Sequence, residues 1–501
     1  MGLAIERERF TAAEFARYTQ RLREQLPVLR ELLGRPGFGE GPASIGAEVE
    51  LHLVDAELQP LAQNQAVLAS AHDPRLTLEL NRFNLEVNAP PVALAGTPFA
   101  ALRRDLGSAL TVVQTAARAH RARAVMVGIL PTLRVAHLAD GVLSDAPRYR
   151  ALSRTLRAMR GEPFVAHIKG RESLSAACDD AALEGANASL QVHLRVAPRE
   201  LAHAFNAAQL AAAPLLAATG NSPFFDSKSL WDETRIALFQ QSVDTRLDAK
   251  ERARVPSRVP FGQGWLRDPH EQFRDNVALY PALLPVIGDE DAAAVLRAGG
   301  VPKLDELRLH QGTVWNWNRI VYDPAEGGHL RIEHRLLPSG PTLIDMVANA
   351  ALTVGLTLAL AEDMEHLSQV FPFAHAACNM QLAAKHGLRA ELLWYCENTR
   401  SVRPRSARGL LLELLPRAES ALTAAGVDAR EATELLGIVR ERIESGRTGA
   451  AVQRALVAQF ERTMPRTEAL ARMLEVYLES SSQDVPVHSW GLDTSIRQAV
   501  D

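Results

Sequence analysis

Four short segments of this chain alternate apolar residues with polar ones, and the polar ones are mostly acids, amides, imidazoles and arginines. The segments are Ile45–Asp55, Leu85–Pro91, Ser189–Val196 and His329–Arg335. Successive side chains of a β-strand point to opposite faces of a sheet, so residues two apart share a face. The pattern therefore predicts four strands, each with one apolar face and one polar face.

In each predicted strand, the polar side chains lie at alternate positions and therefore share one face. The four sets are Glu48, Glu50 and His52; Asn84, Glu86 and Asn88; Gln191, His193 and Arg195; and Arg331, Glu333 and Arg335. If the strands share a sheet, its polar face suits Mg²⁺ and phosphate groups. Two simpler explanations stay open. Each polar face could merely be solvated, as in any half-exposed antiparallel strand, and Glu333 and Arg335 could belong to a cross-strand salt bridge.

Segments with helical spacing of apolar residues separate and follow these strands. They are Thr11–Leu33, Pro98–Arg121, Pro198–Thr219, Gly409–Ala425, Ala429–Ser445 and Gly449–Ser480. Val125–Leu130 is apolar and predicts a central strand, and Phe164–Gly170 predicts a short one. Because no regular βαβ units join the strands, we expect an α+β fold with an antiparallel sheet.

We expect two regions along the 501 residues. Residues 1–381 would form a catalytic antiparallel-sheet domain with an N-terminal helix. Within it, residues 246–303 are irregular and predict a long functional loop or a lid. Residues 382–501 would form a helical region packed on that domain, with a tail at Pro486–Trp490 that could dock onto the body.

Charge and composition exclude several classes of partner. The net charge of −4 gives no reason to expect nucleic acid or an anionic membrane as a partner. The three cysteines are widely spaced, which fits a reducing compartment. The N-terminus lacks the apolar segment of a signal peptide, and Met346–Ala361, the longest apolar run, predicts a buried helix. We therefore expect a cytoplasmic protein.

Standard nucleotide and nucleophile motifs are missing, including the Walker A loop, GxSxG, HExxH and GxGxxG. Any nucleotide would then be held by sheet-borne metals and arginines. Trp231–Arg246 predicts a helix on which Arg235 is either a clamp for a substrate carboxylate or a surface arginine. His310–Asp323 holds two tryptophans and is either a pocket wall or a structural hairpin with packed tryptophans.

Taken in order, five segments resemble the carboxylate–amine ligases related to glutamate–cysteine ligase, the second glutamate–cysteine ligase family. The segments are IGAEVELHLVD, LELNRFNLEVNAPP, SLQVHLRV, AATGNSPFF and LRIEHRLLPSGPTLIDMVANAAL. The resemblance is collinear from about Gly46 to Leu360. It departs from the family's HVHVG pattern at Gln191 and Arg195, which puts the amine substrate in question.

The resemblance implies the glutamine synthetase/guanido-kinase-like fold, a curved antiparallel sheet with helices on one face and the active site on the concave face. It also implies ATP and two or more Mg²⁺ ions, with Mn²⁺ as an alternative. The implied metal ligands are Glu48, Glu50, Glu86, His193 and Glu333. Arg335 and Arg235 would be catalytic, and Arg335, Arg331 and Lys169 would contact the nucleotide. Glu79 is a weaker candidate, because its parity differs from that of Glu86 when counted through the segment between them.

The activity that this resemblance implies is ligation in two steps. ATP phosphorylates a carboxylate, with the γ-carboxylate of glutamate as first choice, and an amine such as cysteine attacks the acyl-phosphate. Two alternatives remain, a metal-dependent phosphotransferase or hydrolase, and a non-catalytic binder of amino acids or nucleotides. The sequence leaves the oligomeric state open, and a homo-oligomer is compatible with it.

Overall fold

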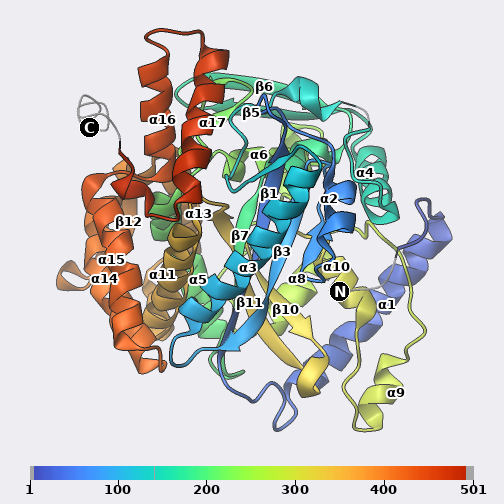
Figure 1. The fold of residues 1–501 in the computed structure, drawn as a ribbon. Coiled ribbons are helices and arrows are strands. Elements are labelled where there is room, and N and C mark those ends of the chain that lie inside the picture. Colours follow the sequence, from blue (N-terminus) through green and yellow to red (C-terminus); the bar gives the residue numbers. More distant parts are fainter. Residues whose placement is uncertain (1–4, 140, 492–501) are drawn as a thin grey trace.

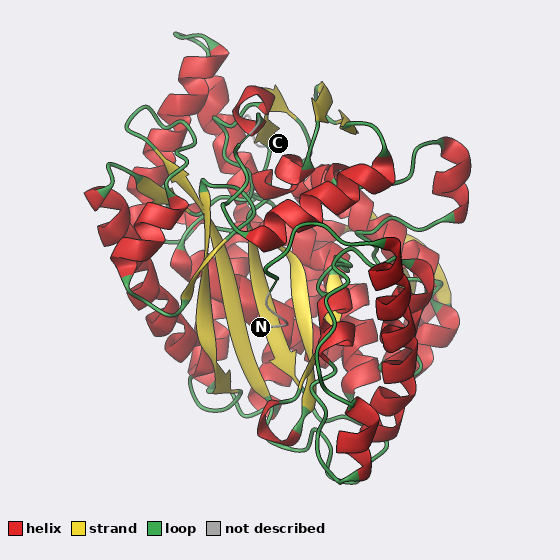
Figure 2. Cartoon of the chain, turned by 90° about the vertical axis from the view of Figure 1, so that its right-hand side faces the viewer, coloured by secondary structure: helices red, strands yellow, loops and turns green. Residues whose placement is uncertain are grey.

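The computed structural model describes residues 5–139 and 141–491, and its centre is a seven-stranded antiparallel sheet. The strands are β1 Ser44–Val54, β2 Leu76–Leu78, β3 Asn84–Ala93, β4 Arg123–Val125, β7 Ser189–Arg195, β10 Asn318–Asp323 and β11 His329–Pro338. Their order is β10-β11-β7-β1-β3-β2, and β4 pairs with one end of β1. The four predicted polar strands are therefore β11, β7, β1 and β3, side by side in the curled sheet (Figure 2). The predicted α+β fold is confirmed.

Helices cover the apolar face of the sheet in two layers (Figure 1). The inner layer holds α3 (Pro98–Ala119), α5 (Leu201–Thr219) and α11 (Leu343–Ala361), and the outer layer holds α13 (Phe373–His386), α14 (Ala407–Ala424) and α15 (Ala429–Ser445). Among the described residues, α5 and α11 are the helices long and apolar enough to cross a membrane. Because 89% and 83% of their apolar windows are buried inside the protein, both are core helices. The predicted buried helix at Met346–Ala361 is thus confirmed.

The remaining elements surround this core. They are α1 Ala12–Leu33, α2 Asn64–Ala71, α4 Pro147–Arg160, β5 Phe164–Lys169, β6 Ser173–Cys178, β8 Phe224–Phe225, β9 Lys228–Ser229, α6 Arg235–Ser242, α10 Asp305–Gln311, α12 Met364–Val370, β12 Glu391–Cys396, β13 Ser401–Ser406, α16 Gly449–Phe460 and α17 Arg466–Ser482. Helix α1 begins at the predicted cap, where Thr11 and Glu14 form a capping box.

Three predicted elements differ from the structure. The chain after Val125 leaves the sheet, so the predicted central strand is only the three-residue β4 at its margin. The predicted helix Gly449–Ser480 is two helices, because α16 ends at Phe460 and Pro465, with extended backbone, is the N-cap of α17. The hairpin of β12 and β13 interrupts a region that we predicted as mainly helical.

The segment 246–303 is not one long loop, because it contains three short helices. They are α7 (Ala249–Arg254), α8 (His270–Leu279) and α9 (Ala292–Arg297). Gln272 on α8 donates to the Asn318 carbonyl and accepts from the Ile320 N–H, so it pairs with the open edge of β10. This part of the segment covers a sheet edge, and a lid role for the rest stays a prediction.

The structure decides two interpretations that the sequence left open. Trp315 and Trp317 are buried and pack edge-on against Phe239, with ring centroids 6.0 and 5.7 Å away. They therefore belong to the core, as the structural interpretation predicted. The C-terminal tail docks on α11, where the Val487 N–H donates to Asp345 Oδ2 at 2.9 Å. The predicted boundary near residue 381 stays a prediction, since α13 and α14 both pack against α5.

Candidate active site

The polar face of the sheet is arranged in rows across the strands. In one row, Arg319 of β10 lies opposite Glu333 of β11, which lies opposite His193 of β7 and then Gly46 of β1. In the next row, Glu48 lies between Gln191 and Asn88. A third row places Glu50 opposite Glu86 and Glu86 opposite Thr77 of β2. Directly opposite residues share a face, so one surface carries all of these side chains.

Three carboxylates meet at one end of this surface. Oxygen atoms of Glu50, Glu79 and Glu86 lie within 4.8 Å of one another. The Ser189 N–H (2.7 Å) donates to Glu50, and Thr77 Oγ1 (3.0 Å) donates to Glu86. Within residues 5–139 and 141–491, none of the three carboxylates has an Arg, Lys or His nitrogen within 4.0 Å. This group, which we call the acidic cluster, is oriented by hydrogen bonds but not neutralised.

The pKa values of the three carboxylates in the acidic cluster are raised, because positive charge does not offset their burial and mutual repulsion. Burial, and then the charges of Glu48 and Glu50, raise the pKa of Glu86 to about 8. Burial also raises the pKa of Glu50, although Arg335 and Arg235 oppose the shift. The pKa of Glu79 is well above 4.5, through burial and then through Glu86 and Glu50. A divalent cation would relieve this repulsion.

Glu48 and His193 form a second group beside the acidic cluster. His193 Nε2 lies 3.2 Å from Glu48 Oε1, and Arg331 Nε donates to His193 Nδ1 at 3.1 Å. Because an arginine can only donate, the remaining imidazole proton must lie on Nε2, facing Glu48. Burial acts to raise the pKa of Glu48, but His193 outweighs it and the pKa is lowered. His193 Nδ1 is therefore hydrogen-bonded within the protein, whereas the buried Nε2 lies close to Glu48 without forming a hydrogen bond of regular geometry.

Glu333 is held by two arginines. Arg319 Nε and Nη2 donate to Glu333 Oε2 at 3.0 and 2.8 Å, and Nη2 also lies 2.9 Å from Oε1. Arg335 Nη1 donates to the same Oε1. Burial acts to raise the pKa of Glu333, but Arg319 and Arg335 hold it well below 4.5. The predicted cross-strand salt bridge thus exists, and it joins Glu333 to Arg319.

Gln191 links the two ends of the polar face. Its Oε1 accepts from Arg335 Nη1 at 2.6 Å, and its Nε2 donates to Glu50 Oε1 at 3.1 Å. This is one of the positions where the sequence departs from the HVHVG pattern. The amide can serve both a cation and an anion, so the departure keeps Arg335 and Glu50 in place.

Three of the predicted polar residues do not reach the open part of this face. Arg235 is 2% exposed, and its Nη1 donates to Glu233 Oε1 and to the Leu336 carbonyl, both at 3.1 Å. Lys169 is exposed at the end of β5, in a hairpin separate from the central sheet. His52 is fully buried, with its Nδ1 3.0 Å from Asn84 Nδ2. This geometry favours a supporting role for Arg235 beneath β11 over the predicted direct clamp.

Comparison with known proteins identifies the family of this chain. The model of the family described as glutamate-cysteine ligase family 2 matches residues 44–475. The chain belongs to this family. Our sequence-based resemblance is therefore confirmed. No curated protein sequence matches the chain significantly.

One solved structure has the same fold as this family member, and a second is a weaker match. Glutamate–cysteine ligase from Francisella tularensis, in complex with AMP, matches with a TM-score of 0.56 and 11% identity over 92% of both chains. A bifunctional glutathione synthetase from Pasteurella multocida matches with a TM-score of 0.49 and 12% identity. The match covers 92% of this chain and 55% of that one. At these identities the first likeness establishes the fold.

Three residues of the site were undervalued or missed in the sequence. Glu79 belongs to the acidic cluster although its parity in the sequence differs from that of Glu86. The chain turns at residues 82 and 83, between β2 and β3, so counting alternate residues through this segment does not predict which face of the sheet a side chain shares. Counted from β2, which ends one residue before it, Glu79 shares a face with Thr77, which lies opposite Glu86. In the sequence, Arg319 stood out only as a member of the tryptophan-containing segment His310–Asp323. Glu184, in the 3₁₀ turn Ala181–Ala186, had no periodic signal, and burial followed by the charge of Glu50 raises its pKa to about 8.

The residues present fit the divalent cations that this family implies. Glu50, Glu79 and Glu86 provide an all-oxygen donor set, which is the kind that Mg²⁺ and Mn²⁺ prefer. Hydrogen bonds from backbone and side-chain groups orient these carboxylates, as outer groups commonly do for metal ligands. Glu48, His193 and Glu333 are also near, but each is bound to another side chain.

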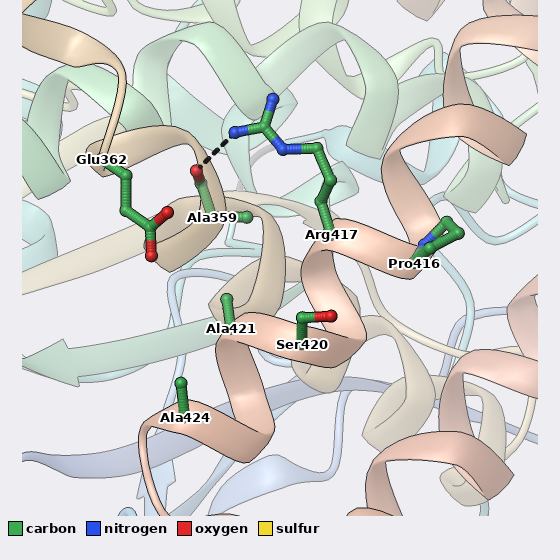
Figure 3. A pocket seen from close by; sticks show the side chains of 7 residues that line it. All are labelled: Ala359, Glu362, Pro416, Arg417, Ser420, Ala421 and Ala424. Atoms are coloured by element: carbon green, nitrogen blue, oxygen red, sulfur yellow. Dashed lines mark hydrogen bonds between the residues drawn. The ribbon is translucent and has the colours of Figure 1, made fainter.

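A surface pocket of about 350 Å³ lies elsewhere, between the end of α11 and α14 (Figure 3). Across its mouth, Arg417 Nη2 donates to the Ala359 carbonyl at 2.9 Å and pairs with Asp363 at 2.6 Å. The residues that line it include none of the polar face. Its arginine is committed to the protein, so it offers no comparable chemistry.

Proposed function

We propose that this protein is an ATP-dependent ligase that joins a carboxylate to an amine, with glutamate and cysteine as the first substrates to test. The acidic cluster carries the proposal, because its three carboxylates, unpaired with any basic side chain of the described residues, share one face of the sheet with Arg335. That combination suits metal-bound nucleotide phosphates. Membership of glutamate–cysteine ligase family 2 supports the same class of reaction. The soluble-enzyme fold supports a cytoplasmic location.

The proposed reaction needs charge stabilisation and positioning more than a nucleophilic side chain. A carboxylate oxygen of the substrate attacks the γ-phosphorus of ATP, and ADP leaves. The amine then attacks the acyl carbon, the phosphate leaves with its electron pair and the amide loses a proton. Divalent cations held by the acidic cluster would neutralise phosphate charge.

The protein's own residues would set the geometry. Arg335, whose charge acts on Glu50, and Arg331, which holds His193, would each turn from the present partner towards a phosphate. Arg235 donates to the backbone carbonyls of Leu336 and Arg335, so it would fix the strand that presents Arg335. Exclusion of water would protect the acyl-phosphate from hydrolysis.

Mg²⁺-dependent ADP release tests the proposal. We expect ADP only when glutamate and an amine are both present, in a panel of amines that includes cysteine. Glu86→Gln should abolish the release, because it removes a carboxylate of the acidic cluster. Glu57→Gln, a substitution at an exposed position, serves as the matched control and should retain full activity.

Other outcomes would replace the proposal. ADP formed at the same rate without any amine would indicate a hydrolase or phosphotransferase. Nucleotide binding without ADP release, across a panel of carboxylates and amines, would indicate a binding protein. Full activity of Glu86→Gln would show that the acidic cluster takes no part in the reaction.

A further inference from the structure

The strand that presents Arg335 is irregular at that residue. His334 of β11 lies opposite Val192 of β7. Leu337 lies opposite Leu190, so β11 has one more residue than β7 between the two pairs. This irregularity is a β-bulge, which bends a strand and redirects its side chains. Arg335 therefore lies on a stretch of backbone that has no regular pairing partner in β7.

A buried arginine supports this stretch of backbone instead. Arg235 Nη1 donates to the Leu336 carbonyl at 3.1 Å, and its Nη2 donates to the Arg335 carbonyl at 3.5 Å. Arg235 is paired at 3.1 Å with Glu233 Oε1, whose side chain is fully buried. The Asn221 N–H donates to Glu233 Oε2 at 2.9 Å. The support of the bulge thus extends from Arg235 through Glu233 to Asn221.

The side chain of Asn221 joins this support to the C-terminal helices. Its Nδ2 donates to the Ser339 carbonyl, just after β11, at 2.8 Å and to the Tyr477 hydroxyl of α17 at 2.9 Å. Its Oδ1 accepts from Gln453 Nε2 of α16 at 2.8 Å. The Tyr477 hydroxyl in turn donates to the Met126 carbonyl at 2.7 Å. Because Asn221 and Gln453 are fully buried, no solvent replaces a hydrogen bond that is lost between them.

Two glycines leave the space that this arrangement needs. A Cβ on Gly449, at the start of α16, would collide with Asn221 Oδ1. A Cβ on Gly340 would lie 2.9 Å from Asn221 Nδ2 and 2.6 Å from the Tyr477 hydroxyl. The helices α16 and α17 form a hairpin at the C-terminal end of the fold (Figure 1). Asn221 is therefore enclosed between this hairpin and the chain that leaves β11.

We propose that Asn221 is a positioning residue through which the hairpin of α16 and α17 holds the bulge and hence Arg335. This role rests on the ligase activity proposed above, in which the guanidinium of Arg335 turns towards a phosphate. The guanidinium has to move while its backbone stays in place, and the bulge lacks a regular strand partner to keep it there. The C-terminal helices would thus contribute to the reaction through the backbone of β11.

Steady-state kinetics test the role of Asn221. Asn221→Asp keeps an acceptor for Gln453 but loses the donor to Ser339, and it should lower kcat by about 10–100-fold. Gln453→Met and Tyr477→Phe act on the same asparagine from the two helices, and each should lower kcat by about 5–10-fold. They keep the test decisive if Asn221→Asp does not fold. The KM for the amine should stay within about twofold of the wild-type value, because Arg335 would contact the phosphate.

A double-mutant cycle separates positioning from a general loss of structure. In an Arg335→Lys background, Gln453→Met should change kcat by less than about twofold, because its effect passes through the arginine that is already replaced. A merely structural role would lower kcat by the same factor in both backgrounds. That result, or wild-type kcat in both Gln453→Met and Tyr477→Phe, would overturn the proposal. Gln459→Met, at a partly exposed position of α16, is the matched control and should keep wild-type kcat.

Hydrogen exchange tests the same support without turnover. Gln453→Met and Tyr477→Phe should speed amide exchange in residues 334–339 by about tenfold or more, whereas Gln459→Met should not. Faster exchange together with no ADP release from any substrate pair would count against the proposed ligase but would confirm the support of β11. Unchanged exchange in both variants would refute the role of Asn221, whether or not the protein is a ligase.

Discussion

Replacing Glu79 by glutamine should stabilise the metal-free protein and remove its response to divalent cations. Glu79 accepts a hydrogen bond from the Leu80 N–H and faces Glu50 and Glu86, and no basic side chain of the described residues pairs with any of the three. Glutamine keeps the shape and cannot ionise, so it removes the repulsion that Glu79 adds when the acidic cluster loses its protons. Most substitutions at partly buried positions destabilise, so an increase in stability would be specific evidence for the acidic cluster.

The size of the expected stabilisation follows from the distances between the carboxylates. Two unit charges 4.8 Å apart repel by about 3.5 kcal/mol at an effective dielectric constant of about 20. Only part of the rise in the pKa of Glu86 to about 8 reflects repulsion between carboxylates, because burial is its largest cause and Glu48 and Glu50 come next. Partial exposure and proton uptake both limit the repulsion, so we expect Glu79→Gln to add about 1–3 kcal/mol to the free energy of unfolding.

The raised pKa values also determine how the stability of the protein changes with pH. The folded protein holds protons on these carboxylates that the unfolded chain has lost, so wild-type stability should fall as pH rises from about 4.5 to about 8. The advantage of Glu79→Gln should therefore be absent near pH 5 and largest near pH 8.

Denaturant unfolding in EDTA, compared with unfolding in Mg²⁺, measures both effects. The wild type should gain stability from Mg²⁺ at pH 8, and Glu79→Gln should gain little. Glu57→Gln, at an exposed position, should behave like the wild type in both conditions. The electrostatic reasoning is refuted if Glu79→Gln destabilises the metal-free protein, or if its effect is the same at pH 5 and pH 8.

Three further substitutions test the packing around the site. Glu333→Gln should lower the free energy of unfolding by about 3–5 kcal/mol, because it leaves two largely buried arginines without their buried anion, and chemical denaturation should detect the loss. Arg442→Met should cost a similar amount by stranding Asp345, its buried partner at 2.7 Å, and a Asp345→Asn background should reduce that cost in a double-mutant cycle. Gly340→Ala should cost about 2 kcal/mol or more, since φ is +79° and the new Cβ would collide with the Met126 carbonyl; an unchanged melting temperature would contradict this.

The strands of the polar face could be predicted because their signal is local. A period of two in β1 fixed which side chains share a face, and family resemblance then supplied the order of the motifs. Glu50 and Glu86 are directly opposite each other in the structure, as two acidic strands in one sheet would require. The α+β fold followed from the same segments.

Residues that depend on turns and on pairing between distant strands could not be predicted in this way. Parity fails for Glu79 because the chain turns between β2 and β3. The partnership of Arg319 with Glu333 depends on the register of the β10–β11 hairpin, which no short motif specifies. Arg235 carries the right charge, but its burial beneath β11 is decided by tertiary packing. Which carboxylates pair with arginines and which do not is decided only in the folded chain.

Oxygen-18 transfer tests the central proposal most directly. Glutamate labelled in its γ-carboxylate would be incubated with ATP, Mg²⁺ and the amine that supports ADP release, and the phosphate product would be analysed by mass spectrometry. An acyl-phosphate pathway predicts one labelled oxygen in each phosphate released, because the carboxylate oxygen leaves with the phosphoryl group. Unlabelled phosphate, with ADP still formed, would show that water receives the phosphoryl group and that the protein is not a carboxylate–amine ligase.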